Sequence, residues 1–149
     1  MAETGNKTMM GVVAVLLLMF VAAIFFLMIT LLMPFVKMAR ARGHRITCEN
    51  NLREISIGLL RYAADHAEAF PEDLGKLYPE YLKDRSVFDC PSSRKLGTQE
   101  DPDYKYNPGL KLWASPRGVI VEDRDGNHRG NGKNVLRMDG SIEWDKPAR

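Results

Sequence analysis

Two cysteines are the most reactive side chains of this chain of 149 residues, and Cys48 and Cys90 are the only ones it has. Two buried thiols and a disulfide are both compatible with such a pair. Zinc sites built from cysteines alone need four of them, so these two cannot form one by themselves. The sequence leaves the state of the two sulfurs open at this point.

Oxygen-bearing side chains at alternate positions are a second candidate site. Asp123, Asp125 and Asn127 have this spacing, and calcium is bound by six to eight oxygen ligands. The pattern is not an EF-hand, because its glycine is misplaced and no glutamate follows at the twelfth position. A turn with solvated carboxylates explains the same residues. Calcium is therefore the one cofactor considered, and no other is expected.

His128 lies in a loop rich in glycine and asparagine. As a metal ligand or general base it would need partners, and Asp123, Asp125 and Asp139 are the nearest in sequence. Hydrogen bonding to loop carbonyl groups is the alternative. The chain has no nucleophile elbow, no glycine-rich phosphate loop and no His-Glu-x-x-His zinc motif. We therefore expect a protein without enzymatic activity.

The elements that position these residues start with an apolar segment, residues 9–36, which contains no charged residue. About 20 apolar residues in a helix cross the roughly 30 Å hydrocarbon layer. A cleavable signal has a shorter apolar region followed by a site of small residues, which is not found here. We expect a retained transmembrane helix after a short tail, residues 1–8. Pro34 is expected to kink this helix.

Apolar residues then recur at steps of three and four, which predicts that an amphipathic helix continues over residues 37–68 and ends at Phe70-Pro71. Residues 69–149 are expected to form a small globular region with short strands at 104–106 and 119–121. Asp139-Gly140 predicts a C-terminal hairpin with a two-residue type I′ turn, which would place Val135 opposite Trp144. The fold class is α+β, a long N-terminal helix packed on a small antiparallel sheet.

The charge is nearly balanced, with 21 Lys and Arg residues against 19 Asp and Glu residues and a net charge of +2. Nucleic-acid binders concentrate unpaired basic groups, so we expect no nucleic-acid partner. Lys37, Arg40, Arg42 and Arg45 follow the apolar segment. By the positive-inside rule they would place the C-terminal region in the cytoplasm.

The order of several short motifs resembles the type IV pilins and type II secretion pseudopilins, and more closely a pseudopilin-like family with a C-terminal His-x9-Asp-Gly motif. The resemblance covers residues 34–144. Its elements, in order, are Pro34, the basic Ala39–Arg42, Cys48-Glu-Asn50-Asn51-Leu52-Arg-Glu-Ile55, Tyr62-Ala63, Phe70-Pro71, Tyr81-Leu82, Phe88-Asp-Cys90-Pro91 and Asn134-Val135-Leu136-Arg-Met-Asp139-Gly140. Ten residues, in place of nine, separate His128 from Asp139.

This resemblance implies a pilin-like fold and a structural protein of, or accessory to, a type II secretion or type IV pilus-like assembly. It implies a single-pass protein of the inner membrane with its C-terminal domain outside the cytoplasm. The expected partners are the lipid bilayer and other pilin-like subunits or secretion machinery, including copies of this chain, reached through the N-terminal helix. Export implies a disulfide between Cys48 and Cys90, worth roughly 4 kcal/mol for a loop of about 42 residues.

One departure from the family concerns the N-terminal recognition site, where prepilins have a glutamate. No acidic residue occurs between Glu3 and Glu49 in this chain. We therefore expect an unprocessed N-terminus and a membrane-resident protein that does not polymerise. Two alternatives stay open. One is an anchored extracytoplasmic binding module that uses the 91–131 loops, and the other is a cytoplasmic tethered enzyme with free cysteines.

Overall fold

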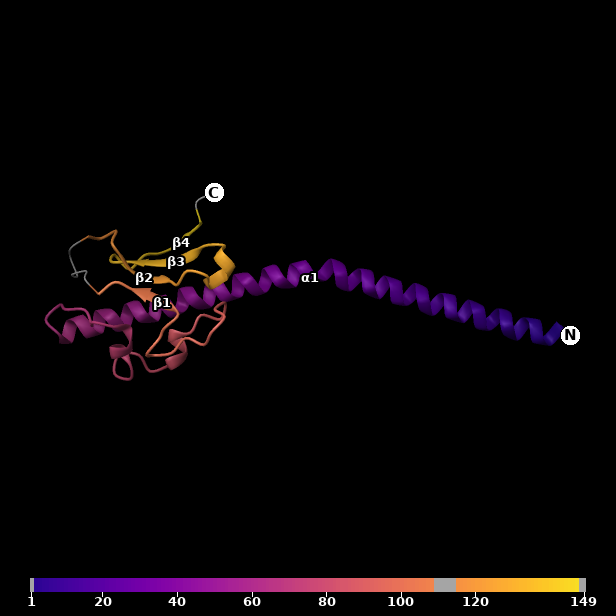
Figure 1. Ribbon diagram of the computed structural model, residues 1–149, viewed down its shortest axis with the longest axis horizontal. Coiled ribbons are helices and arrows are strands. Elements are labelled where there is room, and N and C mark those ends of the chain that lie inside the picture. The colour runs from indigo at the N-terminus through magenta and orange to yellow at the C-terminus, as the bar shows by residue number, and fades with distance from the viewer. Residues whose placement is uncertain (1, 109–114, 148–149) are drawn as a thin grey trace. The chain divides into compact units, whose positions relative to one another are not determined.

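The computed structural model describes residues 2–108 and 115–147, and the side chains of residues 9–108 and 115–147. It separates two compact units, Met1–Arg40 and Ala41–Arg149. Helix α1, Ala2–Asp65, contributes to both units (Figure 1). Of the predicted tail, residues 1–8, the described residues 2–8 belong to this helix. Trp113, an aromatic residue whose ring could stack on a sugar or a peptide, lies outside the described residues.

The first unit consists of the apolar part of α1. All of its large apolar side chains from Met9 to Val36 are exposed. The helix is long and apolar enough to cross a membrane, which agrees with the expected transmembrane segment. Pro34 lies inside α1. The kink at this residue stays a prediction.

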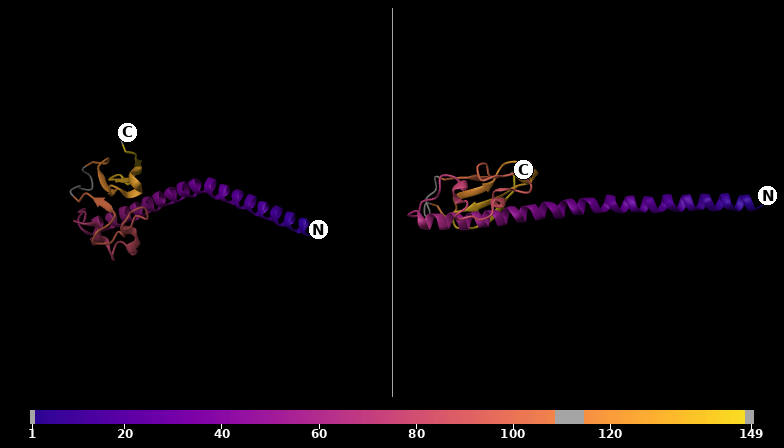
Figure 2. Two further views of the ribbon diagram at one scale, coloured as in Figure 1. Left: turned by 45° about the vertical axis from the view of Figure 1, so that its right-hand side comes forward. Right: turned by 90° about the horizontal axis from the view of Figure 1, so that it is seen from below.

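The second unit is an α+β domain, as predicted. Its sheet consists of β1 (Tyr104–Tyr106), β2 (Val119–Asp123), β3 (Lys133–Arg137) and β4 (Ile142–Asp145), all antiparallel and in sequence order. The described residues also form three 3-10 helices: η1 (Leu74–Leu77) and η2 (Arg85–Phe88) lie between α1 and β1, and η3 (Asn127–Gly130) lies between β2 and β3. The sheet lies along the final turns of α1, as two views agree (Figures 1 and 2).

A seam of buried side chains on α1 joins the helix to the rest of this unit. Cys48, Leu52, Ile55, Leu59 and Ala63 are at most 2% exposed and recur at steps of three and four. The other buried members of the core come from the η1–η2 segment and from the sheet: Leu74, Leu77, Leu82, Val87, Phe88, Cys90, Tyr104, Ile120, Val121 and Leu136. The predicted amphipathic helix is thus confirmed as the central element of the core.

Helix α1 ends at Asp65, three residues before the predicted end. Ala67 and Glu68 adopt left-handed conformations with φ of 52° and 65°. The Glu68 amide donates to the Ala63 carbonyl at 2.8 Å, which closes the last turn. At the other end, residues from Ala41 onward belong to the globular unit.

The C-terminal hairpin forms, but the predicted turn and register are wrong. Of the two predicted turn residues, Asp139 and Gly140, only Gly140 has a positive φ, 82°. A type I′ turn needs positive φ at both residues. The Gly140 amide donates to the Arg137 carbonyl at 3.0 Å. Four residues separate the end of β3 at Arg137 from the start of β4 at Ile142, so the connection is longer than two residues. Consequently Trp144 pairs with Asn134, and Val135 pairs with Glu143.

Candidate functional site

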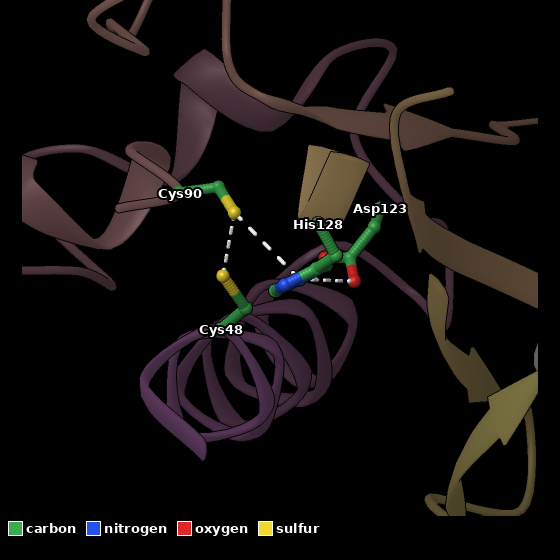
Figure 3. Close-up of side chains that lie close together, drawn as sticks. All are labelled: Cys48, Cys90, Asp123 and His128. Carbon is green, nitrogen blue, oxygen red and sulfur yellow. Dashed lines mark hydrogen bonds and ion pairs between the residues drawn. The ribbon is translucent and has the colours of Figure 1, made fainter. Parts of the chain in front are cut away.

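Four buried side chains from distant parts of the sequence meet beside α1. They are Cys48, Cys90, Asp123 and His128, and their potential ligand atoms all lie within 4.8 Å of one another. Cys48 comes from α1, Cys90 follows η2, Asp123 ends β2 and His128 belongs to η3 (Figure 3). Their exposed fractions are 0%, 1%, 1% and 7%. Solvent is therefore largely excluded from the cluster.

The distances within this four-residue cluster form a continuous chain of contacts. The two sulfurs are 2.7 Å apart. The Cys90 Sγ lies 3.8 Å from His128 Nε2, which in turn lies 3.1 Å from Asp123 Oδ2. Both cysteines are free in the structure. The disulfide between them stays a prediction, although the fold does bring the pair together.

Asp103 holds the backbone at Cys90. Its Oδ2 accepts a hydrogen bond from the Cys90 amide at 3.0 Å, and its Oδ1 accepts one from the Ser93 hydroxyl at 3.0 Å. The Asp103 side chain is itself buried. A buried carboxylate that accepts two hydrogen bonds is well placed to fix a turn. The loop that carries Cys90 is therefore tied to the start of β1.

His128 reaches the cluster from an unusual backbone conformation. It has φ of 54°, and the next residue, Arg129, has φ of 57°. Left-handed conformations are rare in residues other than glycine and cost free energy unless the surroundings support them. The Trp144 ring packs edge-to-face on the imidazole, with centroids 5.3 Å apart. Packing on Trp144 and the contact to Asp123 contribute to that support.

Asp123 is the most deeply buried charged group of the cluster. Its Oδ2 accepts hydrogen bonds from the Asn134 amide at 2.6 Å and from the Asn134 side chain at 3.0 Å. Its Oδ1 is the one buried side-chain oxygen or nitrogen of the described residues without a hydrogen-bond partner. An unpartnered buried oxygen is costly, so this atom calls for a partner of another kind.

The contacts inside the cluster shift the pKa values of its members in different directions. The hydrogen bond with Cys90 and burial raise the pKa of Cys48. The hydrogen bond from Cys48 outweighs burial at Cys90 and, with His128, lowers the pKa of that thiol to about 6. Burial lowers the pKa of His128, but the hydrogen bonds to Asp123 and Cys90 outweigh it and raise the pKa to about 9. A negative charge on Cys90 is thus favoured over one on Cys48.

This arrangement differs from the relay of a cysteine hydrolase. In such a relay the nucleophile contacts one imidazole nitrogen and the carboxylate contacts the other. Here Cys90 and Asp123 both approach Nε2 of His128. One nitrogen therefore faces both groups, and all four side chains are buried.

The three residues predicted to bind calcium, Asp123, Asp125 and Asn127, have different surroundings in the structure. Only Asp123 belongs to the cluster. The Asn127 side chain donates to the Asp103 carbonyl at 2.9 Å, and Asp125 is exposed. A site made of Asp123, Asp125 and Asn127 therefore receives no support from the positions of these side chains.

The structure also separates the predicted motif of His128, Asp139 and Gly140. Asp139 and Gly140 lie in the β3–β4 connection, where Asp139 accepts hydrogen bonds from the Ser141 amide at 2.9 Å and from the Ser141 hydroxyl at 2.6 Å. These bonds lower the pKa of the exposed Asp139. Asp139 thus shapes the turn, whereas His128 belongs to the buried cluster.

Two residues with a clear role at the cluster were not predicted. Asn134 orients Asp123, and Asp103 orients Cys90. Asn134 lies in β3 and Asp103 directly precedes β1, and the local sequence pattern marks neither position as buried.

A second feature is an open groove of about 970 Å³ on the same unit. Its lining includes the basic side chains of Arg94, Lys95, Arg124 and Arg129, together with His44. The His44 Nδ1 lies 3.1 Å from the Ser92 hydroxyl. The groove falls within the loops that were predicted as a binding surface.

Comparison of this chain with protein-family models, with curated proteins and with solved structures gave no match in any of the three searches.

Proposed function

We propose that this chain is a membrane-anchored, pilin-like structural protein, a component of or accessory to a type II secretion or type IV pilus-like assembly. The observation that carries the proposal is that helix α1 has two parts with different surroundings. The same helix, Ala2–Asp65, provides an exposed apolar stretch and, from Cys48 onward, the central seam of a small α+β core. In pilin-like proteins the helix has these same two tasks.

The proposed mode of action is lateral association within the bilayer. Apolar side chains such as Phe20 and Leu27, 64% and 58% exposed, would contact lipid and the helices of like subunits. Van der Waals packing drives such association, because lipid tails are as apolar as leucine. The missing glutamate supports an accessory, membrane-resident subunit over a fibre subunit. The globular unit would lie outside the cytoplasm, as the ordered motif series suggests.

A cysteine scan of the apolar segment tests lateral association. The variants Phe20→Cys, Ile24→Cys and Leu27→Cys probe one helix face, and Ala22→Cys, Phe26→Cys and Ile29→Cys probe the opposite face. Each is made in the full chain and oxidised in native membranes. We expect cross-linked dimers on one face and few on the other, because packed helices meet along a stripe. The native cysteines are buried and serve as an internal background in the unsubstituted chain.

Monomers at all six positions would contradict the assembly proposal. Equal cross-linking on both faces would also contradict it, because random collisions give no face preference. Intact mass adds a second criterion. An unshortened, unmethylated chain is expected, and a chain cleaved near Gly11 would overturn the unprocessed, accessory form of the proposal.

The second candidate is an anchored binding module that does not polymerise. The groove favours it, since Arg94 and Arg129 line it beside His44, whereas Lys95 and Arg124 in the same lining are ion-paired with Asp101. Its partner would carry negative charge. Binding of an acidic peptide library that is lost in Arg94→Ala and Arg129→Ala variants, with monomers in the cysteine scan, would favour this candidate.

A further inference from the structure

We propose that Cys48, Cys90, Asp123 and His128 bind one transition-metal ion, for which Zn²⁺ is the best match. The site goes beyond the proposed structural function and does not depend on it. It differs from the calcium loop expected from the sequence, with which it shares only Asp123. The proposal rests on the ligand types, their burial, their convergence and the groups that hold them.

The ligand types select the class of metal. Two cysteine sulfurs, one imidazole nitrogen and one carboxylate oxygen make a complete tetrahedral set for zinc. Calcium and magnesium prefer oxygen ligands only, so the two sulfurs exclude them. Among the divalent metals, soft sulfur ligands and a four-coordinate geometry favour Zn²⁺, and Co²⁺ is a suitable spectroscopic substitute.

The ligand atoms converge on a small space. All four lie within 4.8 Å of one another, and His128 Nε2 faces both Cys90 Sγ and Asp123 Oδ2. Ligand distances of about 2.0–2.3 Å place two zinc-bound sulfurs about 3.7 Å apart. The observed separation of 2.7 Å between Cys48 and Cys90 would therefore widen by about 1 Å on binding. Side-chain rotation can supply a shift of this size.

The groups around the cluster are arranged as a second shell. Asn134 holds Oδ2 of Asp123 with two hydrogen bonds, and Asp103 holds the backbone of Cys90. Second-shell groups of this kind fix ligand orientation at metal sites. Oδ1 of Asp123 is buried without a hydrogen-bond donor. A bound cation would provide the missing partner for this carboxylate.

The backbone at His128 adds an independent observation. A buried histidine in a left-handed conformation, φ of 54°, is held there only when its contacts offset the cost. Metal coordination through Nε2 is a contact strong enough to do so. A disulfide between Cys48 and Cys90 would use both sulfurs and leave His128 and Asp123 without a common partner. The metal and the disulfide therefore exclude each other.

The test uses the full chain in detergent micelles. It is purified without chelator and under conditions that keep the thiols from being oxidised. We expect about one zinc per chain by mass spectrometry of the metal, and two free thiols per chain after denaturation in chelator. Replacement by Co²⁺ should give the strong visible absorption of a tetrahedral site and a sulfur-to-cobalt charge-transfer band. This measurement needs no variant, so it holds even if substitutions impair folding.

Matched variants locate the site. Asp123→Asn should abolish the tetrahedral cobalt spectrum, whereas Asp125→Asn, two residues away and exposed, should keep it. His128→Gln and Cys90→Ser should also abolish the tetrahedral cobalt spectrum. His66→Gln should keep the spectrum, because His66 is exposed and directly follows the end of α1. Asn134→Ala should weaken zinc binding about 10–100-fold through loss of ligand orientation.

Three results would overturn the proposal. The first is a reduced chain that takes up neither Zn²⁺ nor Co²⁺ when each is added in excess. The second is a purified chain whose intact mass is lower than that of the reduced chain by the mass of two hydrogen atoms. This loss would show that the two sulfurs form a disulfide. The third is a cobalt spectrum that Asp125→Asn removes and Asp123→Asn leaves intact.

Discussion

Two neighbouring carboxylates on β2 have opposite surroundings because successive side chains of a strand point to opposite faces. Asp123 is buried in the four-residue cluster. Glu122 lies on the other face between two lysines: its Oε2 is 2.8 Å from Lys133 Nζ and its Oε1 is 3.3 Å from Lys105 Nζ. These lysines sit on β3 and β1, so Glu122 links three strands across the sheet. Its charge therefore contributes to sheet stability.

Glu122→Gln should lower the stability of the globular unit at neutral pH and have no effect in acid. Burial raises the pKa of Glu122, but the contacts with Lys133 and Lys105 outweigh burial and lower it below 4.5. The stabilisation is therefore complete above about pH 4.5 and is lost as the pH falls through the lower, folded-state pKa. The expected loss at pH 7 is roughly 0.2–1 kcal/mol in denaturant unfolding.

The control for this measurement is Glu54→Gln, which removes an exposed carboxylate of α1 and should change the unfolding free energy little at either pH. If Glu122→Gln destabilised the unit equally at pH 7 and pH 3, the effect would come from packing rather than charge, and the interpretation of the three-strand link would be wrong.

At the scale of elements, the buried seam of α1 should account for most of the stability of the globular unit. Ile55 is fully buried, whereas Ile57, two residues later on the same helix, is 46% exposed. Ile55→Ala should cost about 2–5 kcal/mol of unfolding free energy, because it removes buried methyl groups and leaves a cavity. Ile57→Ala should cost less than about 1 kcal/mol. Denaturant unfolding followed by near-ultraviolet circular dichroism compares the two variants.

Equal effects of the two isoleucine variants would contradict the position of the seam. Because both substitutions change the same side chain to the same residue in one helix, intrinsic helix propensity cancels in the comparison. The remaining difference measures packing against the sheet and the η1–η2 segment.

Elements with a strong local signal were predicted well from the sequence, and their pairing was not. The spacing of Leu52, Ile55 and Leu59 identified the buried face of α1, since a helical period is a property of neighbouring residues. The hairpin register depends on the length of its connection, which Gly140 alone does not determine. The predicted register was wrong by one residue, so Trp144 pairs with Asn134 and not with Val135.

The resemblance paired Cys48 with Cys90, but their convergence with Asp123 and His128 was beyond prediction for a related reason. Asp123 and His128 were singled out, but as parts of a calcium loop and of a motif with Asp139. Cys48 and Cys90 are 42 residues apart, and His128 is 38 residues beyond Cys90. Contacts at this separation depend on how α1, η2 and β2 pack together, and no local pattern encodes that packing. The structure was needed to show that the cysteines share a space with the imidazole.

For the whole molecule, the side of the membrane on which the globular unit lies can be tested with one substituted position near each end. Lys146 is exposed, and the two native cysteines are buried and should not react in the folded state. In intact cells, a membrane-impermeant maleimide should label Lys146→Cys, because the proposal places this unit outside the cytoplasm. It should label Lys7→Cys only after the cells are permeabilised.

The reverse labelling pattern would place the globular unit in the cytoplasm, as the basic residues Lys37, Arg40 and Arg42 would suggest by themselves. The unsubstituted chain is the control, and labelling of it after denaturation reports the two thiols. Labelling of the unsubstituted chain in its native state would show that Cys48 or Cys90 is more accessible than the structure indicates.

The position of Cys48 along α1 has a mechanical consequence. Among the described side chains, Cys48 is the first buried one that is met from the N-terminus, so tension applied to the anchor would reach it before any other core residue. Its neighbours Cys90, Asp123 and His128 belong to three other segments. A force along the helix would thus be shared among the loop that carries Cys90, strand β2 and helix η3. The contacts of Cys48 with these segments would oppose separation of α1 from the rest of the globular unit.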